Sequence, residues 1–285
     1  MKFFNKTAEV FVPDGRPVQE ALQRTTHLAI GAHQDDLEIM AAAPILECFQ
    51  KKDLWFSGVV VTDGAGSPRA GIYQQYSDQE MRRVRFQEQR KAAMLGEYAA
   101  LVMLDYPSSA ARDGKNARMV DDLSSILKAA RPAIVFTHNL ADKHDTHVGV
   151  ALKTVDAIRR LPAADRPQKL YGCEVWRGLD WMVDEDKVEF NLSGQQNLQN
   201  ALVAVFDSQI SGGKRYDLAV EARHRTNATY FKSHTADAAD SLAFAMDMTP
   251  LIQDETLDPL SFIRKFLERF GRDVEERLER VRSIL

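Results

Sequence analysis

Cysteine is scarce in this sequence: its 285 residues include only two, Cys48 and Cys173. Two thiols cannot form a disulfide framework, and they are too few for a cysteine-rich zinc module. One disulfide remains arithmetically possible, but such low cysteine usage is typical of a reducing compartment. We therefore expect two buried, unpaired thiols in a cytoplasmic protein.

Long apolar runs and an excess of basic residues are also missing. No segment approaches the ~20 apolar residues of a membrane-spanning helix, and charges and amides interrupt the N-terminal residues too early for the core of a signal peptide. The 37 Lys and Arg residues are outnumbered by 41 Asp and Glu residues, which gives a formal net charge of -4. These absences argue against a membrane protein and against nonspecific binding of nucleic acid.

The apolar pattern that is present indicates an α/β fold. Four short aliphatic runs show little polar alternation, which is typical of strands buried on both faces of a parallel sheet. The runs occupy residues 27–32, 58–62, 100–104 and 133–137. Helical spacing follows over residues 81–95, 120–130 and 151–158. This alternation predicts a Rossmann-like, doubly wound and mostly parallel sheet with helices on both faces.

The second half of the chain is less regular. Residues 169–193 fit two or three strands, residues 195–210 a helix, and residues 241–248 a further strand. A long amphipathic helix is predicted over residues 263–281, where apolar residues recur at helical spacing.

No linker, repeat or shift in composition divides the chain. We expect one domain over residues 1–285, with a core at about 25–165 and a C-terminal elaboration at about 166–285. The walls of a ligand pocket are expected from residues 70–80 and 172–235.

The first predicted strand ends in an acidic segment that contains a histidine. His33, Asp35, Asp36 and Glu38 follow directly on the apolar run, where a helix is expected to start. Ligands of open α/β sheets bind beyond the carboxyl ends of the strands. A turn at this place can bring His33 and Asp36 to one point, and zinc accepts both kinds of ligand. Asp35 lies between them as a candidate base that takes a proton from water.

The fourth predicted strand runs into a second cluster of polar residues. His138, Asp142, His144, Asp145 and His147 fall within ten residues. If the first and fourth strands are close in the sheet, His147 completes a His-Asp-His set of ligands with an open position for water. His144 would then stabilise an oxyanion or protonate a leaving amine.

Each cluster also has a purely structural explanation. Asp35 or Asp36 could cap the N-terminus of a helix, where anions are favoured. His144 could cap or pack a loop while His147 faces solvent. The occurrence of both clusters at predicted strand ends favours the metal site.

These segments resemble the motifs of the PIG-L/LmbE-like zinc-dependent deacetylases. The family's Ala-His-Pro-Asp-Asp motif, followed by a Glu, is similar to residues 32–38, and its His-Pro-Asp-His element to residues 144–147. Its Thr-x-Gly loop followed by an Arg resembles residues 62–69, and its Arg-x-x-Glu…Ala…Leu-Gly helix resembles residues 85–96. The order and spacing of the motifs agree over about residues 27–160.

The resemblance implies a role for each residue of the two clusters. His33, Asp36 and His147 would hold a Zn2+ ion, or another divalent metal such as Fe2+, since this set of ligands suits several metals. Asp35 would be the general base, and His144 the acid or the electrostatic catalyst.

The resemblance also implies a substrate. Arg69 would approach the substrate or the oxyanion, and Asp142 is assigned to the same substrate-binding group. The family removes N-acetyl groups from amino sugars and their conjugates, releasing acetate and a free amine, and some members cleave other amides of sugar-thiol conjugates. The expected partner is a small N-acetylated amino sugar, and a homo-oligomer is compatible with the sequence.

Two departures from the family pattern leave alternatives open. Gln34 replaces a Pro, which should loosen the turn but keeps every functional group. Asp145 and Thr146 replace Pro-Asp, so the carboxylate directly before His147 is missing, and Asp142 or Asp145 could substitute for it. A non-catalytic metal- or sugar-binding relative is therefore an alternative. A nucleotide-binding module fits poorly, because no Gly-x-Gly-x-x-Gly follows the first strand.

Overall fold

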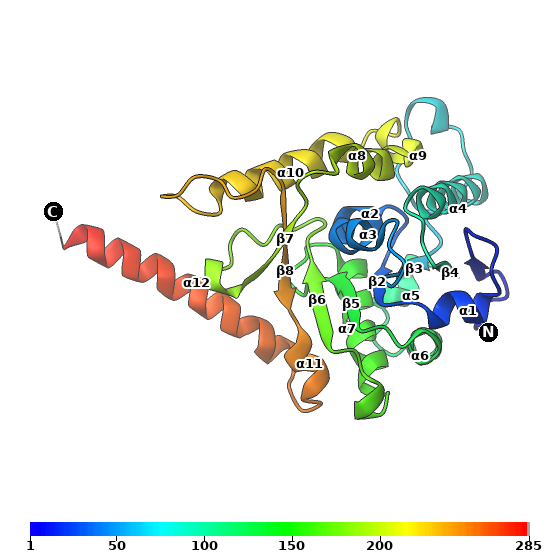
Figure 1. Ribbon diagram of the computed structural model, residues 1–285, viewed down its shortest axis with the longest axis horizontal. Coiled ribbons are helices and arrows are strands. Elements are labelled where there is room, and N and C mark those ends of the chain that lie inside the picture. The colour runs from blue at the N-terminus through cyan, green and yellow to red at the C-terminus, as the bar shows by residue number, and fades with distance from the viewer. Residues whose placement is uncertain (284–285) are drawn as a thin grey trace.

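The computed structural model describes residues 1–283, which contain a mixed, mostly parallel sheet of eight strands (Figure 1). The strands lie in the order β1-β4-β3-β2-β5-β6-β8-β7. Their bounds are β1 (Glu9–Phe11), β2 (His27–Gly31), β3 (Phe56–Thr62), β4 (Ala100–Tyr106), β5 (Ile134–His138), β6 (Lys169–Cys173), β7 (Lys187–Asn191) and β8 (Leu242–Asp247). Neighbours from β4 to β6 are parallel, whereas β1, β7 and β8 pair antiparallel to their neighbours. The predicted fold class is confirmed.

The central strands are buried because helices cover both faces of the sheet. Every residue of β2 and β3 is buried. Along β2, Leu28 and Ile30 point into one hydrophobic core, and Ala29 points into the other. Both faces of such a strand need apolar residues, which explains the absence of polar alternation in the sequence.

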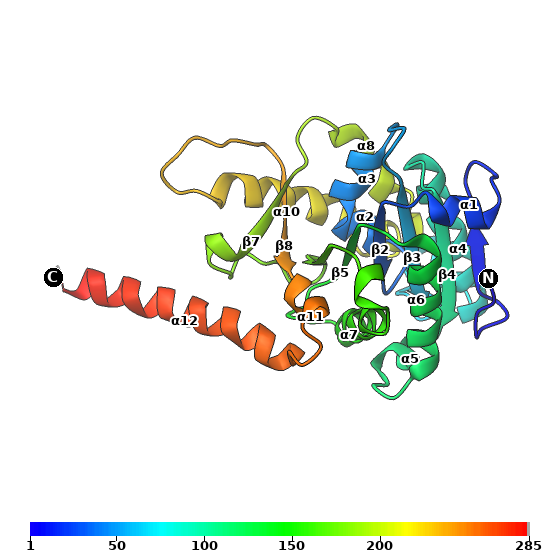
Figure 2. The ribbon, with the colours of Figure 1, turned by 60° about the horizontal axis from the view of Figure 1, so that its bottom comes forward.

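The helices form a layer on each face of the sheet (Figure 2). The first core includes residues of α1 (Val18–Gln23), α5 (Ser108–Arg112), α6 (Ala117–Ala130), α7 (Asp145–Arg159) and α11 (Thr249–Gln253). The second core includes residues of α2 (Asp36–Met40), α3 (Ala42–Cys48), α4 (Asp78–Leu95) and α8 (Gln196–Ala204). The shorter or peripheral helices are α9 (Asp207–Ile210), α10 (Tyr216–Tyr230) and the 3-10 helices η1 (Gly71–Tyr73), η2 (Ala163–Asp165) and η3 (Asp184–Asp186).

Some elements differ from the sequence-based expectation. The helix predicted over residues 195–210 is divided into α8 and α9, because Phe206 leaves the helical conformation (φ -87, ψ 55). β1, α1 and α10 were not predicted. Only three residues of α10 are buried, and two of these, His224 and Asn227, are polar, so α10 lacks an apolar stripe.

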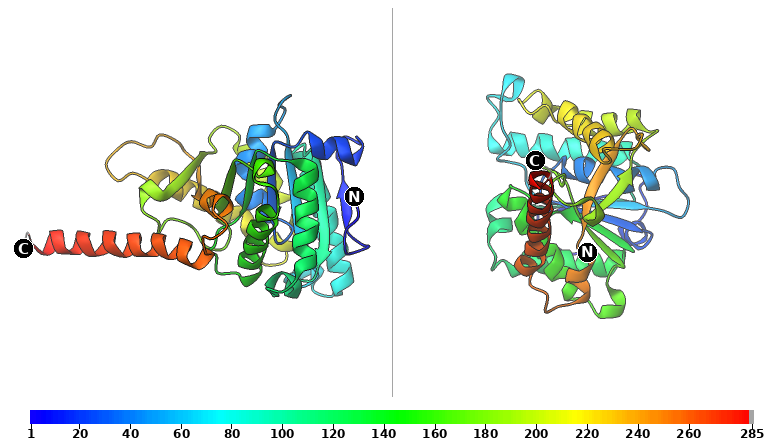
Figure 3. Two further views of the ribbon diagram at one scale, coloured as in Figure 1. Left: turned by 90° about the horizontal axis from the view of Figure 1, so that it is seen from below. Right: turned by 90° about the vertical axis from the view of Figure 1, so that its left-hand side faces the viewer.

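The C-terminal region extends the same sheet and ends in a long helix. β6, β8 and β7 continue the sheet beyond β5, and α12 (Pro259–Arg282) follows α11. Figures 1 and 3 show α12 running away from the sheet, so that its last turns project beyond the rest of the molecule. Among residues 1–283, no helix is both long enough and apolar enough to cross a membrane.

Candidate functional site

A cavity of about 520 Å³ opens at the carboxyl ends of β2 and β5. The two strands are parallel neighbours, so the polar segments that follow them meet. The cavity is lined by His33, Asp35, Asp36, Ile39, Gly64, Gly66, Ser67, Pro68, Arg85, Ser108, Arg112, His144, Thr146, Val175, Trp176, Gln209, Lys214 and Tyr216. Its walls include the expected C-terminal residues, but residues 64–68 and 108–112 replace the expected residues 70–80.

The turn after β2 brings His33 and Asp36 together. Asp35 has a left-handed backbone (φ 82), a conformation that Asp tolerates better than most side chains do. α2 then begins at Asp36, whose Oδ2 accepts a hydrogen bond of 2.6 Å from the backbone N–H of His33. This hydrogen bond closes the turn and holds the carboxylate beside the imidazole.

The segment after β5 places two further histidines at the same point. His144 is the N-cap of α7, where its Nδ1 accepts a hydrogen bond of 3.3 Å from the backbone N–H of Thr146. His147 lies in the first turn of α7 and is fully buried. His144 thus caps the helix, as the structural alternative had it, but His147 does not face solvent, and His144 also lies on the cavity wall.

Three donor atoms have the spacing of ligands around one metal ion. His33 Nδ1 lies 3.2 Å from His147 Nε2 and 3.3 Å from Asp36 Oδ2, and the latter two atoms are 3.4 Å apart. Ligands at ~2.0–2.2 Å from a tetrahedral ion are separated by about 3.3–3.6 Å. The three side chains would fit a zinc-like ion, and His33 and Asp36 also line the cavity.

The protonation states of these groups also suit a cation. Burial lowers the pKa of His147 to about 4, so His147 is neutral at physiological pH, as a metal ligand must be. Burial raises the pKa of Asp36, but His147 and His138 lower it by more, and the result is well below its usual value. Asp36 is therefore ionised.

Asp142 lies behind His147 and not at the substrate side of the cavity. Its Oδ2 is 3.6 Å from His147 Nδ1 and accepts a hydrogen bond from the backbone N–H of Trp176. Its Oδ1 accepts one from the backbone N–H of His144. A carboxylate in this place favours the tautomer of His147 that leaves Nε2 free for a metal. This position differs from the expected substrate-binding role.

His138 is a residue of the site that the motif analysis left without a role. Its Nε2 accepts a hydrogen bond of 2.9 Å from the backbone N–H of Ala32 and lies 3.4 Å from Asp36 Oδ2. Its ring stacks on that of His147 at 3.9 Å. Asp36, His138 and His147 form a second group of potential ligands, as do His33, His144 and His147. His138 is the last residue of a buried strand, and this position in the sequence could have identified it as a residue of the site.

Asp35 is held by a buried arginine from α4. Arg85 Nη2 lies 3.0 Å from Asp35 Oδ2 and also donates to the backbone oxygen of Gln34. Arg85 Nη1 lies 3.5 Å from Glu88, whose carboxylate also accepts hydrogen bonds from Ser208. Burial raises the pKa of Asp35 to about 6, against the opposing charge of Arg85. Such a carboxylate is poised to exchange protons near neutral pH.

Two other expectations change with the structure. Arg69 forms an ion pair with Asp78 and donates to the backbone oxygen of Ala65, so its guanidinium is engaged at the edge of the loop and does not line the cavity. Gln34 does not loosen the turn: its Nε2 donates a hydrogen bond of 3.0 Å to the backbone oxygen of Thr62, which connects the turn to β3.

Asp145, one of the two residues named as a substitute for the missing carboxylate before His147, has an exposed side chain.

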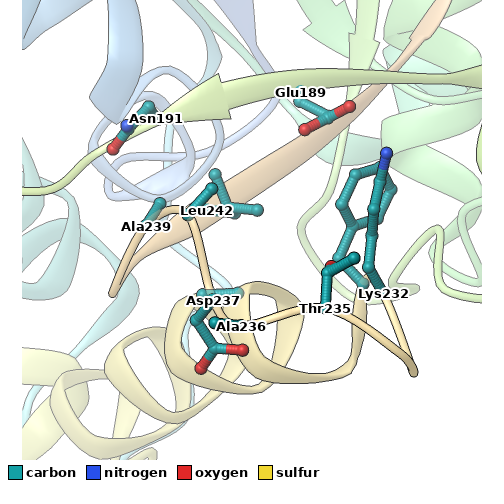
Figure 4. A pocket seen from close by; sticks show the side chains of 11 residues that line it. Glu189, Asn191, Lys232, Thr235, Ala236, Asp237, Ala239 and Leu242 are labelled. Carbon is teal, nitrogen blue, oxygen red and sulfur yellow. The ribbon is translucent and has the colours of Figure 1, made fainter.

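A second cavity, of about 320 Å³, lies between the antiparallel pair of β7 and β8 and the segment that follows α10 (Figure 4). Glu189 and Asn191 of β7 line one side, and Lys232, Thr235 and Asp237 line the other. None of its lining residues is a histidine or a cysteine. It therefore lacks the imidazole ligands of the first cavity.

Comparisons with known proteins match the part of the chain that carries His33, Asp36 and His147. Residues 28–158 match the family described as "PIG-L: GlcNAc-PI de-N-acetylase". The "Uncharacterized deacetylase YaiS" of Escherichia coli K12 is 29% identical over 156 residues, which cover 53% of this chain and 77% of YaiS.

Solved structures share the fold at low sequence identity. The N,N'-diacetylchitobiose deacetylase of Pyrococcus horikoshii has a TM-score of 0.61 at 17% identity, over 81% of this chain and 86% of that one. GalB of Pseudomonas putida, a 4-carboxy-2-hydroxymuconate hydratase, has a TM-score of 0.58 at 14% identity, over 79% of this chain and 96% of that one. Proteins that share this fold therefore catalyse more than one kind of reaction. The match at residues 28–158, which include both ligand-bearing segments, shows that this part of the chain is similar to the PIG-L family.

Proposed function

We propose that this protein is a metal-dependent deacetylase that hydrolyses the N-acetyl group of an amino sugar or amino-sugar conjugate. The main observation behind this proposal is the arrangement of three donor atoms, from His33, Asp36 and His147, which lie 3.2 to 3.4 Å apart. The buried carboxylate of Asp35 lies beside them. The family match and the deacetylase relative support this reading.

The ligand set suits Zn2+, and Fe2+ is the main alternative. A bound divalent ion would lower the pKa of a water molecule and polarise the acetamide carbonyl. All other parts of the chemistry come from side chains of this chain.

Asp35 is the proposed general base. Arg85 holds its Oδ2, which leaves the other carboxylate oxygen to accept a proton from the attacking water. With a pKa of about 6, most Asp35 side chains are ionised at neutral pH, yet the protonated form is acidic enough to pass its proton on. Asp35 then protonates the amine nitrogen as the C–N bond breaks, and acetate and a free amine leave.

His144 is the proposed electrostatic catalyst. Burial and the nearby His33 lower its pKa, and its Nδ1 accepts the N–H of Thr146. The neutral ring therefore carries its proton on Nε2. A hydrogen bond from this N–H would stabilise the negative oxygen that develops on the carbonyl.

The cavity wall supports a sugar-like substrate with a negative group. Trp176 and Tyr216 are in edge-to-face contact at 6.2 Å, and Lys214 Nζ lies 5.0 Å from the Trp176 ring. Arg112 adds a second cation to the wall. Aromatic faces can stack on a sugar ring, and the cations attract carboxylate or phosphate. An amidase that acts on a sugar-thiol conjugate is the second candidate, since it would use the same chemistry on another amide.

The test is amine release from a panel of N-acetyl amino sugars and their conjugates by zinc-reconstituted protein. Asp35→Asn should keep one metal per chain and lose at least about a thousandfold in kcat. Asp145→Asn is the matched control and should keep full activity, because this carboxylate is exposed and is not among the residues that line the cavity. Metal loss in Asp35→Asn, or activity of this variant close to the wild type, would contradict the role of Asp35. Water addition to an enol substrate without amine release would favour hydratase chemistry instead.

A further inference from the structure

α12 has an apolar stripe that is largely exposed within the described residues from Leu267 onward. The helix is anchored at its start, where Phe262 is buried and Arg269 pairs with Asp186 of η3. Phe270 contacts Trp181 in an edge-to-face arrangement at 6.3 Å. The C-terminal part of the helix projects away from the sheet (Figure 3).

The stripe continues through the projecting part. Leu278 and Val281 are 60% and 54% exposed, and Leu267 is 49% exposed. The apolar positions are 263, 267, 270, 274, 278 and 281. Their mean spacing equals the 3.6-residue period of an α-helix, so the stripe runs straight along one face and does not wind around the helix.

The stripe is symmetric about Val274. Phe270 and Leu278 lie four residues to either side of it, and Leu267 and Val281 lie seven residues to either side. A two-fold axis through Val274 would therefore place Phe270 opposite Leu278 of the partner subunit, and Leu267 opposite Val281 of the partner subunit. An isologous contact between two copies needs this self-complementarity.

The charges of the helix favour the antiparallel arrangement. Residues 259–272 contain four basic side chains and one acidic one, residues 273–279 contain four acidic side chains and one basic one, and Arg280 and Arg282 follow. In an antiparallel pair about Val274, Arg269 lies opposite Glu279 of the partner subunit, and Arg272 lies opposite Glu276 of the partner subunit. In a parallel pair, like charges would lie side by side, which is unfavourable.

We propose that two copies of this chain dimerise through α12, antiparallel and with the two-fold axis at Val274. The surface involved is the apolar stripe from Leu267 to Val281. The helix axis is about 36 Å long, so each copy offers a contact of limited length. Dimerisation is therefore expected at micromolar concentrations.

The first test measures the mass of the protein in solution by analytical ultracentrifugation. The protein concentration runs from about 1 to 200 µM, the order of magnitude at which a small interface is expected to form. Wild-type protein should shift from monomer to dimer. The double variant Leu278→Glu, Val281→Glu should remain monomeric with an unchanged circular dichroism spectrum, because both side chains are exposed in the single chain. A monomeric wild type at all concentrations, or a dimer that survives the double substitution, would overturn the proposal.

The second test determines whether the two α12 helices of the dimer are antiparallel or parallel. Under mild oxidation, Val274→Cys should cross-link to itself, since this position lies on the two-fold axis. Leu278→Cys is the matched control and should not, because its antiparallel neighbour is Phe270 of the partner subunit. The native cysteines, Cys48 and Cys173, are buried and should not interfere. Equal cross-linking of both variants would indicate a parallel pair and would refute the antiparallel arrangement.

Discussion

Arg85 forms a buried ion pair with Asp35, with 3.0 Å between Nη2 and Oδ2. The two residues come from different segments, the turn after β2 and the middle of α4, and both side chains are almost fully buried. The proposed base is thus oriented by a cation that is itself fixed by Gln34 and Glu88. This arrangement leads to the first prediction.

Arg85→Met should shift the pH dependence of activity. Arg85 favours the charged form of Asp35, so its loss should raise the pKa of Asp35 above about 6. A raised pKa leaves less ionised base at a given pH, and the acidic limb of kcat should move to higher pH. The variant should also lose about 3–5 kcal/mol of unfolding free energy, since two buried carboxylates lose their cation.

The kcat of Arg85→Met is measured between about pH 5 and 9, a range around the ordinary pKa values of carboxyl and imidazole groups. Urea unfolding gives the free energy of unfolding of the same variant. Arg82→Met is the matched control, because Arg82 lies on the same helix but pairs with Asp105. An unshifted acidic limb in Arg85→Met would show that Asp35 is not the group that titrates.

Substitution of Gly64 should destabilise the loop after β3. Gly64 has a φ of +67, and a Cβ at this position would lie 2.3 Å from Oε1 of the buried Gln34. Gly64→Ala should therefore reduce the unfolding free energy by about 1–3 kcal/mol. Gly66→Ala, in the same loop, would place its Cβ in open space and should be nearly neutral. Thermal unfolding of the two variants compares them directly, and equal melting temperatures would be inconsistent with the clash.

Removal of single histidines should separate the three overlapping groups of potential ligands. His147→Ala should abolish stoichiometric zinc binding, because His147 belongs to all three groups. His138→Ala should keep one zinc per chain, since His138 Nε2 already accepts the N–H of Ala32. The loss of that hydrogen bond should cost about 1–3 kcal/mol of stability.

Elemental analysis after dialysis measures the metal content of both histidine variants, and thermal unfolding measures their stability. If His138→Ala loses its metal while His33→Ala keeps it, the ion would be held by Asp36, His138 and His147 instead.

Lys214→Met should weaken binding of negatively charged substrates only. Lys214 is held over Trp176 on the cavity wall, where its ammonium can contact a carboxylate or phosphate. KM should rise about tenfold for such substrates, which corresponds to about 1.4 kcal/mol, with kcat unchanged. Neutral N-acetyl sugars should be unaffected. Lys128→Met, at an exposed position of α6, serves as the control. A rise of KM for neutral and charged substrates alike would show that Lys214 does not act through its charge.

The sequence predicts the fold and the ligand triangle for one physical reason. The strands before His33 and before the segment of His147 are mostly apolar and show little polar alternation, which is typical of central parallel strands. Parallel strands end at the same edge of a sheet, and the polar clusters that follow them must therefore meet if the strands are neighbours. The structure places β2 beside β5.

Side-chain direction is what the sequence could not supply. Asp142 is two residues from His144 and five from His147, but only the folded loop shows that its carboxylate turns to the back of His147. Arg69 was assigned from its motif position, whereas its local pairing with Asp78 depends on how the loop meets α4. α10 was missed because it buries polar residues and has no apolar stripe.

Two parts of the chain line the cavity, one with the proposed reactive groups and one with the proposed substrate-binding groups. The three donor atoms and Asp35 belong to residues 28–158, whereas Trp176, Lys214 and Tyr216 come from the C-terminal region. Reactive groups and recognition groups can therefore vary independently in evolution. A graft of the C-terminal wall from a relative would change which compounds fit the cavity and leave the reacting centre intact, which makes this wall the natural target for redesign of selectivity.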